Sequence, residues 1–413
     1  MVSERKIKAG KPLKIVVSGA ARQMNLGGPS IFHGLVKVFR RVFPECEIVY
    51  HEPGSGFTGE AQADPHHSGI RIWRGNPDAK KTILAAWRSR LPGGFRTGRS
   101  LEQILVEEIR TANLFVDAWG IDFTDRLSRM NVRGALLGKP LLRAAAISGT
   151  PAVHYTASYG PMHGRWMRLA ARQVLGRHCA LVFCREERSQ EILKECGVPD
   201  AKLPLAPDTG FLMSRQDVEL EGVDPHRPVL GVSISHQIIR QWQAPTPYLD
   251  LIAELCDRAI AQWQVQVLLI PNEMTSAGYD DRAVARDVLA RVKNRTEVRV
   301  LPAERYSGPE LKGAIGRCDF FVASRYHSIV AAMSLGVPTV VIGWHHKYAE
   351  LLAKFRQDDV GLSSADCSLE ALWIRCQDVW ARRSTVQKTI QECLPAVESR
   401  IYQAGELLRD VMF

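Results

Sequence analysis

Short runs of apolar, often β-branched residues alternate with stretches of helical periodicity along most of the chain. The first unit of this pattern is an apolar run at 15–17, a glycine-containing loop at 25–29 and a helical stretch that ends near Phe43. Ser30 is the expected N-cap of that helix. Strands that alternate with helices favour a parallel sheet with helical crossovers. The other strands predicted for this sheet lie at 48–50, 114–116, 152–155 and 181–184.

The alternation is interrupted once, by a polar and proline-bounded segment at 214–228, which we interpret as a linker. It separates an N-terminal domain, 1–213, from a C-terminal domain, 229–413. A helical tail from about residue 385 could cross back onto the first domain. The predicted strands of the second sheet lie at 229–234, 265–270, 298–301, 320–323 and 338–342. The predicted fold class is therefore α/β, with two Rossmann-like parallel-sheet domains facing a cleft, which resembles the GT-B architecture of many sugar-modifying enzymes.

The segment 51–100 differs from its surroundings because it is rich in glycine, proline, histidine and arginine. We interpret most of it as an irregular insertion over the carboxyl edge of the first sheet. Long loops in compact domains are often lids or binding loops. Its arginine and tryptophan side chains are candidates for shaping a binding site: Arg71, Trp73, Arg74 and Trp87.

The charge balance favours anionic partners. The 413 residues include 54 lysines and arginines against 44 acids, a net charge of +10. Phosphorylated metabolites, nucleic acid and an anionic membrane face would all suit such an excess. Zinc-finger spacing and aromatic-basic runs are absent from the sequence, so nucleic acid is not an expected partner.

Cysteine usage and hydropathy indicate a cytoplasmic protein. The nine cysteines are scattered without a Cys-x-x-Cys pair, which predicts buried reduced thiols. The longest apolar run, 329–343, is broken by Gly336 and Pro338, so no membrane-spanning segment is expected. The pairs His66-His67 and His345-His346 do not predict a metal site, because adjacent histidines point apart and a third ligand is not visible.

The strongest candidate for chemistry is the segment that follows the predicted strand at 320–323. Ser324 is the expected cap of a helix that runs to Leu335, which puts Arg325 and His327 in its first turn. A helix N-terminus favours an anion, an arginine fork suits phosphate or carboxylate, and a histidine titrates near neutrality. Geometry alone does not distinguish this site from a purely structural role, in which Ser324 only caps the helix and His327 is an ordinary polar residue of its first turn.

The same segment resembles the polysaccharide pyruvyl transferase family. The family signature is a Ser-Arg-hydrophobe-His turn, an alanine-rich helix, Gly-x-Pro, a hydrophobic strand and then a lysine. In this chain these positions are Ser324, Arg325, Tyr326, His327, Gly336, Pro338 and Lys347. Matches in the same order lie upstream, at Asn25 and Gly27, at Tyr159 to Pro161, at Arg185 and at Asp208.

The resemblance implies transfer of the enolpyruvyl unit of phosphoenolpyruvate onto saccharide hydroxyls as a ketal, in polysaccharide or glycolipid biosynthesis. It implies no cofactor, a donor site in the C-terminal domain and an acceptor site in the N-terminal domain. His327 and Arg325 are then the catalytic residues, with Arg185 expected to face Arg325 across the cleft. The remaining residues assigned to substrate binding are Ser324, Tyr326, Lys347, Asp208, Asn25 and Gly27.

The chain departs from the family pattern at a few positions, most of them on the acceptor side. Gly28 stands where the family has an acid, and Asp117-Ala118-Trp119-Gly120 replaces a triple-glycine turn. Tyr326 replaces a common leucine within the donor turn, which is otherwise intact. These departures leave the identity of the acceptor open.

Two other functions remain open at this point. The chain could be a GT-B glycosyltransferase that uses a nucleotide sugar, or a non-catalytic relative that binds an acidic ligand. Residues 161–178 also predict a basic amphipathic helix with Arg165, Arg168 and Arg172 on one face. Such a helix is either an ordinary solvated surface or a peripheral contact with the inner membrane face, which would suit a lipid-linked acceptor.

Overall fold

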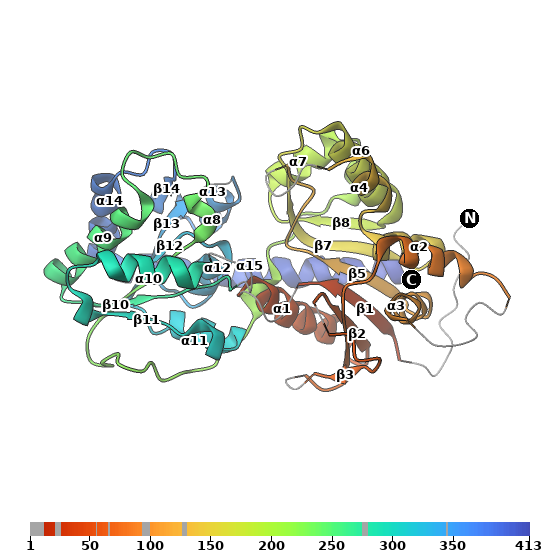
Figure 1. The fold of residues 1–413 in the computed structure, drawn as a ribbon, viewed down its shortest axis with the longest axis horizontal. Helices are drawn as coiled ribbons and strands as arrows, with labels where there is room; N and C mark the ends of the chain where they lie inside the picture. Colours follow the sequence, from red (N-terminus) through yellow and green to blue (C-terminus); the bar gives the residue numbers. More distant parts are fainter. Residues whose placement is uncertain are drawn as a thin grey trace. The chain divides into compact units, whose positions relative to one another are not determined.

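The computed structural model divides the chain into two compact units, which we describe separately. Unit 1 contains Met1–Ala20, Val36–Ala206 and Tyr402–Phe413, and unit 2 contains Ala21–Leu35 and Pro207–Ile401. Figure 1 shows the fold of both units. The structure describes residues 12–20, 26–54, 56–64, 67–92, 100–125, 130–274, 280–343 and 346–413.

Unit 1 is built on an eight-stranded sheet in which the strands are parallel except for the short edge strand β3. Its order is β3-β4-β2-β1-β5-β7-β6, and β8 pairs with β7. The central strands read as continuous apolar runs because both faces are buried. The strands are β1 (Lys14–Gly19), β2 (Glu47–Glu52), β3 (Gln62–Ala63), β4 (Ile70–Arg74), β5 (Leu114–Ala118), β6 (Ile121–Asp122), β7 (Ala152–Tyr159) and β8 (Leu181–Cys184).

The helices from α1 to α6 lie between successive strands of this sheet, whereas α7 follows its last strand and α15 ends the chain (Figure 1). Two helices, α1 and α15, each have residues in both units. The helices are α1 (Gly27–Val42), α2 (Ala79–Arg88), α3 (Leu101–Arg110), α4 (Val132–Leu137), α5 (Pro140–Ser148), α6 (Arg165–Gln173) with a π-helical turn at Val174–His178, α7 (Glu187–Glu195) and α15 (Arg383–Met412).

Unit 2 is built on a six-stranded, fully parallel sheet of order β11-β10-β9-β12-β13-β14. The strands are β9 (Val229–Ser233), β10 (Gln266–Leu269), β11 (Val298–Val300), β12 (Phe320–Ala323), β13 (Thr339–Gly343) and β14 (Gly361–Ser363). The helices are α8 (His236–Ile239), α9 (Tyr248–Trp263), α10 (Asp281–Arg291), α11 (Gly308–Ile315), α12 (Tyr326–Ser334), α13 (His346–Ala353) and α14 (Leu369–Ala381).

Both sheets have the strand order of a Rossmann fold. In unit 2 the first strand, β9, lies between β10 and β12, and in unit 1 β1 lies between β2 and β5. The strand order reverses at these points, and ligands of such sheets bind beyond the carboxyl ends of the two strands. The α/β fold class with two parallel-sheet units is therefore confirmed.

Several local predictions need correction. The segment 51–100 contains the strands β3 and β4 and the helix α2, which the sequence did not predict. Helix α1 begins at Gly27, so Ser30 lies inside it and donates a hydrogen bond to the Leu26 carbonyl (2.7 Å). The proposed linker 214–228 belongs to unit 2, where the Gln216 amide donates to the Pro309 carbonyl (2.9 Å).

The remaining expectations concern the C-terminal helix, the cysteines, membrane spans and metal sites. The last residues of α15, from Tyr402, are grouped with unit 1, and the crossing of the tail onto the first domain stays a prediction. All nine cysteines are buried and none forms a disulfide. Within the described ranges, no helix is both long and apolar enough to cross a bilayer. In the same ranges, no three histidine, cysteine, aspartate or glutamate side chains are grouped to hold a metal ion, while His66 and His345 lie outside them.

Candidate functional site

The candidate site of unit 2 begins at the turn between β12 and α12, beyond the carboxyl end of a switch-point strand. Arg325 is the N-cap residue of α12 in extended conformation, and it makes no side-chain capping bond. The prediction that Ser324 caps the helix is wrong. Its hydroxyl instead lies 3.1 Å from the hydroxyl of Tyr248, and its carbonyl accepts a hydrogen bond from Tyr348 (3.2 Å). The two tyrosines therefore fix the backbone of the turn.

The guanidinium group of Arg325 is held by two carboxylates. Its Nε donates to Oδ2 of Asp281 at 2.9 Å, its Nη2 donates to Oδ1 of the same residue, and its Nη1 donates to Glu273. The two bonds to Asp281 form a bidentate, charge-assisted pair. The sequence assigned the guanidinium group of Arg325 to a donor anion. In the structure this group is bonded within the protein, and Glu273 holds only one of its three nitrogens.

Asp281 organises this part of the site although the sequence reasoning missed it. It is fully buried, and its oxygens accept the backbone N–H groups of His236 (2.9 Å) and Glu273 (2.9 Å). Burial alone would raise the pKa of this carboxyl, but the charge of Arg325 and the hydrogen bonds of His236 lower it to about 2. Asp281 is therefore a carboxylate at neutral pH, and it joins the loops that follow β9, β10 and β12.

His327 and Asp208 form the second part of the site. Nε2 of His327 lies 3.2 Å from Oδ2 of Asp208, whose side chain is fully buried. The other oxygen of Asp208 accepts the N–H of Gly210 (2.7 Å), so the carboxylate is fixed. A fixed carboxylate at this distance helps to orient a histidine ring. The imidazole ring remains 21% exposed and can reach a ligand.

Gly27 stands at the start of α1, directly against the His327 ring. A Cβ atom on Gly27 would lie 2.6 Å from Nδ1 of His327, so a side chain there would displace the imidazole. The first turn of α1 and the first turn of α12 therefore meet at this ring. Because each helix N-terminus carries partial positive charge, the pair of helix ends favours an anion beside His327.

Tyr326 and Lys347 surround the same ring. Tyr326 is buried and lies edge-on to His327, with ring centroids 5.3 Å apart. The ammonium group of Lys347 lies 4.9 Å from the centroid of the Tyr326 ring, a cation–π arrangement. Lys347 is itself buried. Its positive charge therefore lies against the Tyr326 ring, which in turn lies against His327.

Two of the predicted residues, Asn25 and Arg185, are not among the described residues of unit 2. Asn25 lies outside the described residues. Arg185 belongs to unit 1, where it follows β8, is almost fully buried and donates its amide to the Ala157 carbonyl (3.1 Å). Its pairing with Arg325 stays a prediction.

Two further polar atoms lie at the switch point of unit 2. Oγ of Ser235 and Oδ1 of Asn272 are buried, and among the described residues neither has a hydrogen-bond partner. Buried polar atoms without partners are rare and often mark a ligand or water position. Ser235 and Asn272 follow β9 and β10, and the sequence offers only a polar residue after each strand as a signal for them.

The arginine and tryptophan side chains predicted to shape the acceptor side have mostly structural partners. Arg71 pairs with Glu108 (2.9 Å), which also accepts a hydrogen bond from the indole N–H of Trp73 (3.2 Å). Arg74 pairs with Glu52 (2.8 Å). These bonds hold the sheet edge together and leave the side chains little freedom to bind a ligand.

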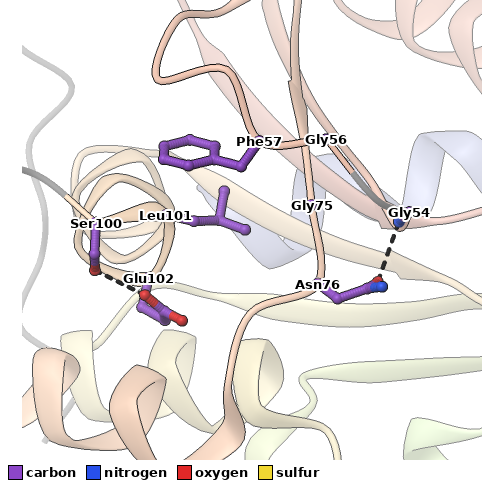
Figure 2. A pocket seen from close by; sticks show the side chains of 8 residues that line it. All are labelled: Gly54, Gly56, Phe57, Gly75, Asn76, Ser100, Leu101 and Glu102. Carbon is purple, nitrogen blue, oxygen red and sulfur yellow. Dashed lines mark hydrogen bonds between the residues drawn. The ribbon is translucent and has the colours of Figure 1, made fainter.

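Unit 1 has a pocket of about 410 Å³ next to the same segment (Figure 2). Its polar groups are largely paired with one another. Oδ1 of Asn76 accepts the N–H of Gly54 (3.1 Å), and the Ser100 hydroxyl donates to Glu102 (2.7 Å). The residues that line it are Gly54, Gly56, Phe57, Gly75, Asn76, Ser100, Leu101 and Glu102. A pocket lined by a carboxylate and no cation does not suit an anionic donor.

Comparison with solved structures assigns the fold to the GT-B-like class. A putative UDP-N-acetylglucosamine 2-epimerase from Listeria monocytogenes has a TM-score of 0.60 at 10% identity, over 92% of this chain and 91% of that chain. HepE of Anabaena in complex with UDP has a TM-score of 0.55 at 13% identity, over 96% and 98%. At these identities the likeness shows the fold alone.

The chain belongs to the polysaccharide pyruvyl transferase family, whose profile matches residues 25–346. The family resemblance inferred from the Ser324–His327 turn is confirmed. The amylovoran biosynthesis protein AmsJ of Erwinia amylovora is 24% identical over 279 residues, which is 60% of this chain. The matched part is 66% of AmsJ, so it spans just under two thirds of that relative.

Proposed function

We propose that the protein transfers the enolpyruvyl unit of phosphoenolpyruvate to hydroxyls of a saccharide during polysaccharide or glycolipid biosynthesis. The observation that carries this proposal is the position of the His327 ring between the buried Asp208 carboxylate and the start of α1 at Gly27. The helix ends favour the phosphate of the donor, and the His–Asp pair supplies an acid or base. Family membership supports the same reaction.

The reaction converts two saccharide hydroxyls and phosphoenolpyruvate into a ketal and phosphate. Both hydroxyl oxygens bond to C2 of the donor, and the bond from C2 to the phosphate oxygen breaks. One hydroxyl proton ends on the methylene carbon, which becomes a methyl group, and the other ends on the phosphate. His327 is proposed to transfer one of these protons, either to the carbon or to the phosphate.

The anionic donor also needs cations, for which Arg325, Lys347 and Arg185 are proposed. Asp281 is buried and bonded on both oxygens, so we expect its pair with Arg325 to persist when the donor binds. Glu273 is more exposed and holds only Nη1 of Arg325. A donor carboxylate could take the place of Glu273 without breaking the bidentate pair.

Thermal unfolding with candidate donors tests this proposal against a glycosyltransferase activity. A ligand at about 100 times its Kd stabilises the folded protein by about 2.7 kcal/mol. We expect phosphoenolpyruvate to raise the unfolding temperature, whereas UDP-glucose and GDP-mannose should not. HepE, which has the same fold, was solved with UDP, so nucleotide sugars are the appropriate competitors. Stabilisation by nucleotide sugars alone would exclude phosphoenolpyruvate as the donor.

We further propose a peripheral contact of unit 1 with an anionic membrane, through the surface formed by α4 and α6. These helices pack side by side (Figure 1). Leu136 on α4 is 64% exposed, and Val132 on α4 and Leu169 on α6 are also exposed. Exposed leucines among arginines are typical of membrane-surface helices. The exposed basic residues on these helices are Arg133, Arg165 and Arg172.

Vesicle co-sedimentation tests this contact. The protein should bind vesicles of phosphatidylcholine with phosphatidylglycerol, and it should bind phosphatidylcholine alone weakly, because anionic lipids attract the arginines. Leu136→Asp should abolish binding. Leu84→Asp is the matched control, since Leu84 is an exposed leucine on α2. Equal binding of the two variants, or equal binding to both kinds of vesicle, would show that α4 and α6 are an ordinary solvated surface.

A further inference from the structure

Trp119 lies at the switch point of the unit 1 sheet, directly after β5. Its side chain is 42% exposed, which is unusual for a tryptophan at a sheet edge. A Cβ atom on Gly19, the last residue of β1, would lie 2.9 Å from the backbone nitrogen of Trp119. The chain after β5 therefore passes closely over the end of β1. A ligand of this sheet is expected to bind at this edge.

A connected set of polar side chains lies beside Trp119. The ammonium group of Lys139 lies 3.2 Å from Oδ2 of Asp117 and pairs with Asp122. Nε2 of His154 lies 2.9 Å from Oδ2 of Asp122, and the Tyr159 hydroxyl lies 2.8 Å from the other ring nitrogen of His154. His154 and Tyr159 are fully buried, so they support the other side chains from the interior of the protein. Only its outer members can meet a ligand.

The outer members are Asp122 and Lys139, whose side chains are 19% and 15% exposed. The ammonium group of Lys139 lies 5.6 Å from the centroid of the Trp119 ring. It bonds to two carboxylates and has three N–H groups, so one donor remains for a ligand. Burial alone would raise the pKa of Asp122, but Lys139 and His154 lower it to about 2, so this residue is an acceptor at neutral pH.

This combination suits a neutral, hydroxyl-rich ligand. An exposed indole face packs against the C–H face of a sugar ring, while a carboxylate and an ammonium group bind its hydroxyls. Two carboxylates and one ammonium group carry no excess positive charge, so phosphate or phosphoenolpyruvate is not favoured there. The pocket in Figure 2 has an aromatic residue of similar exposure, Phe57 at 40%, but its polar groups bond to one another.

We propose that Trp119, Asp122 and Lys139 form the acceptor site of this protein and bind a pyranose ring. The proposal rests on the proposed transfer to a saccharide, whose acceptor it locates. The backbone supports this assignment. Lys139 and Phe123 both have left-handed conformations (φ 56° and 45°), which non-glycine residues adopt rarely and which cluster at functional sites. The Trp119 turn, which departs from the family pattern, then determines which acceptor is used.

Saturation-transfer NMR on the full chain without donor tests the site. The probes are the methyl pyranosides of galactose, glucose and mannose. At least one of them should receive saturation from the wild-type protein, and Trp119→Ala should weaken its binding about tenfold. Trp119→Phe should restore part of the affinity. Phe57→Ala is the matched control, and it should bind like the wild type.

The outcomes separate this site from the proposed reaction. No transfer to any of the pyranosides, equal binding by Trp119→Ala and wild type, or loss of binding only in Phe57→Ala would each overturn the site. Thermal shift with phosphoenolpyruvate is measured on the same proteins, and Trp119→Ala should respond like the wild type. Pyranoside binding that depends on Trp119 without any response to phosphoenolpyruvate would support the sugar site and refute the donor.

Discussion

Replacing His327 with alanine is expected to lower turnover by roughly 10²- to 10⁴-fold, the usual contribution of a positioned acid or base. The fold should survive, because the ring is partly exposed and fills little of the core. Asp208→Asn should reduce turnover less, since the imidazole remains and only its orientation is weakened. The measurement is phosphate release from phosphoenolpyruvate with lipid-linked saccharides, with the product detected by mass spectrometry.

His226→Ala is the matched control for this experiment. His226 is exposed in unit 2, and among the described residues its one contact of this kind is the hydrogen bond from its backbone N–H to Asp224 (2.9 Å). Its replacement should leave turnover unchanged. Wild-type turnover in His327→Ala would remove this histidine from the mechanism. Unchanged circular dichroism and unfolding temperature in all variants would separate a catalytic effect from a loss of fold.

The sheets could be predicted from the sequence because their strands are buried on both faces. Such strands read as continuous apolar runs, and the expected 320–323 coincides with β12. The prediction failed at β4, whose sequence Ile-Arg-Ile-Trp-Arg alternates within a segment rich in glycine and histidine. The glycine- and histidine-rich composition of the segment indicated a loop, whereas the alternation of apolar and polar residues indicates the strand. The start of α12 was placed one residue early, because Ser324 bonds to Tyr248 across the sheet edge and not to its own helix.

Only those parts of the candidate site that lie within one segment of the sequence could be predicted. The order of family motifs indicated Gly27, Asp208 and His327 separately, and the structure of unit 2 brings these three together. No local pattern indicates that a glycine must make room for a histidine that lies far away in the sequence. Asp281 was missed for the same reason, since it looks like an ordinary acid at a helix start. Its role arises because loops after different strands meet at the switch point.

The same Asp281 leads to the largest expected effect on stability. Asp281→Asn would leave the guanidinium of Arg325, whose side chain is 16% exposed, without its bidentate and fully buried partner, and removing one member of such a pair costs about 3 kcal/mol or more. Asp250→Asn is the matched control, because Asp250 pairs with Arg291 (3.0 Å) on the surface. An exposed pair of this kind contributes about 1 kcal/mol or less. Urea unfolding at neutral pH compares the two variants with the wild type.

The loss of stability in Asp281→Asn relative to the wild type should also depend on pH, which gives a stricter test. The pKa of Asp281 falls from 3.8 to about 2 on folding, so the folded state gains stability from the carboxylate above pH 3.8. That contribution should be lost as the pH falls from 3.8 towards 2, because the wild-type carboxyl then becomes protonated as well. The difference in the free energy of unfolding between the wild type and Asp281→Asn should therefore become smaller as the pH falls over this interval. A difference of the same size at pH 7 and near pH 2 would mean that the charge of Asp281 does not stabilise the fold, and that Arg325 is held by packing instead.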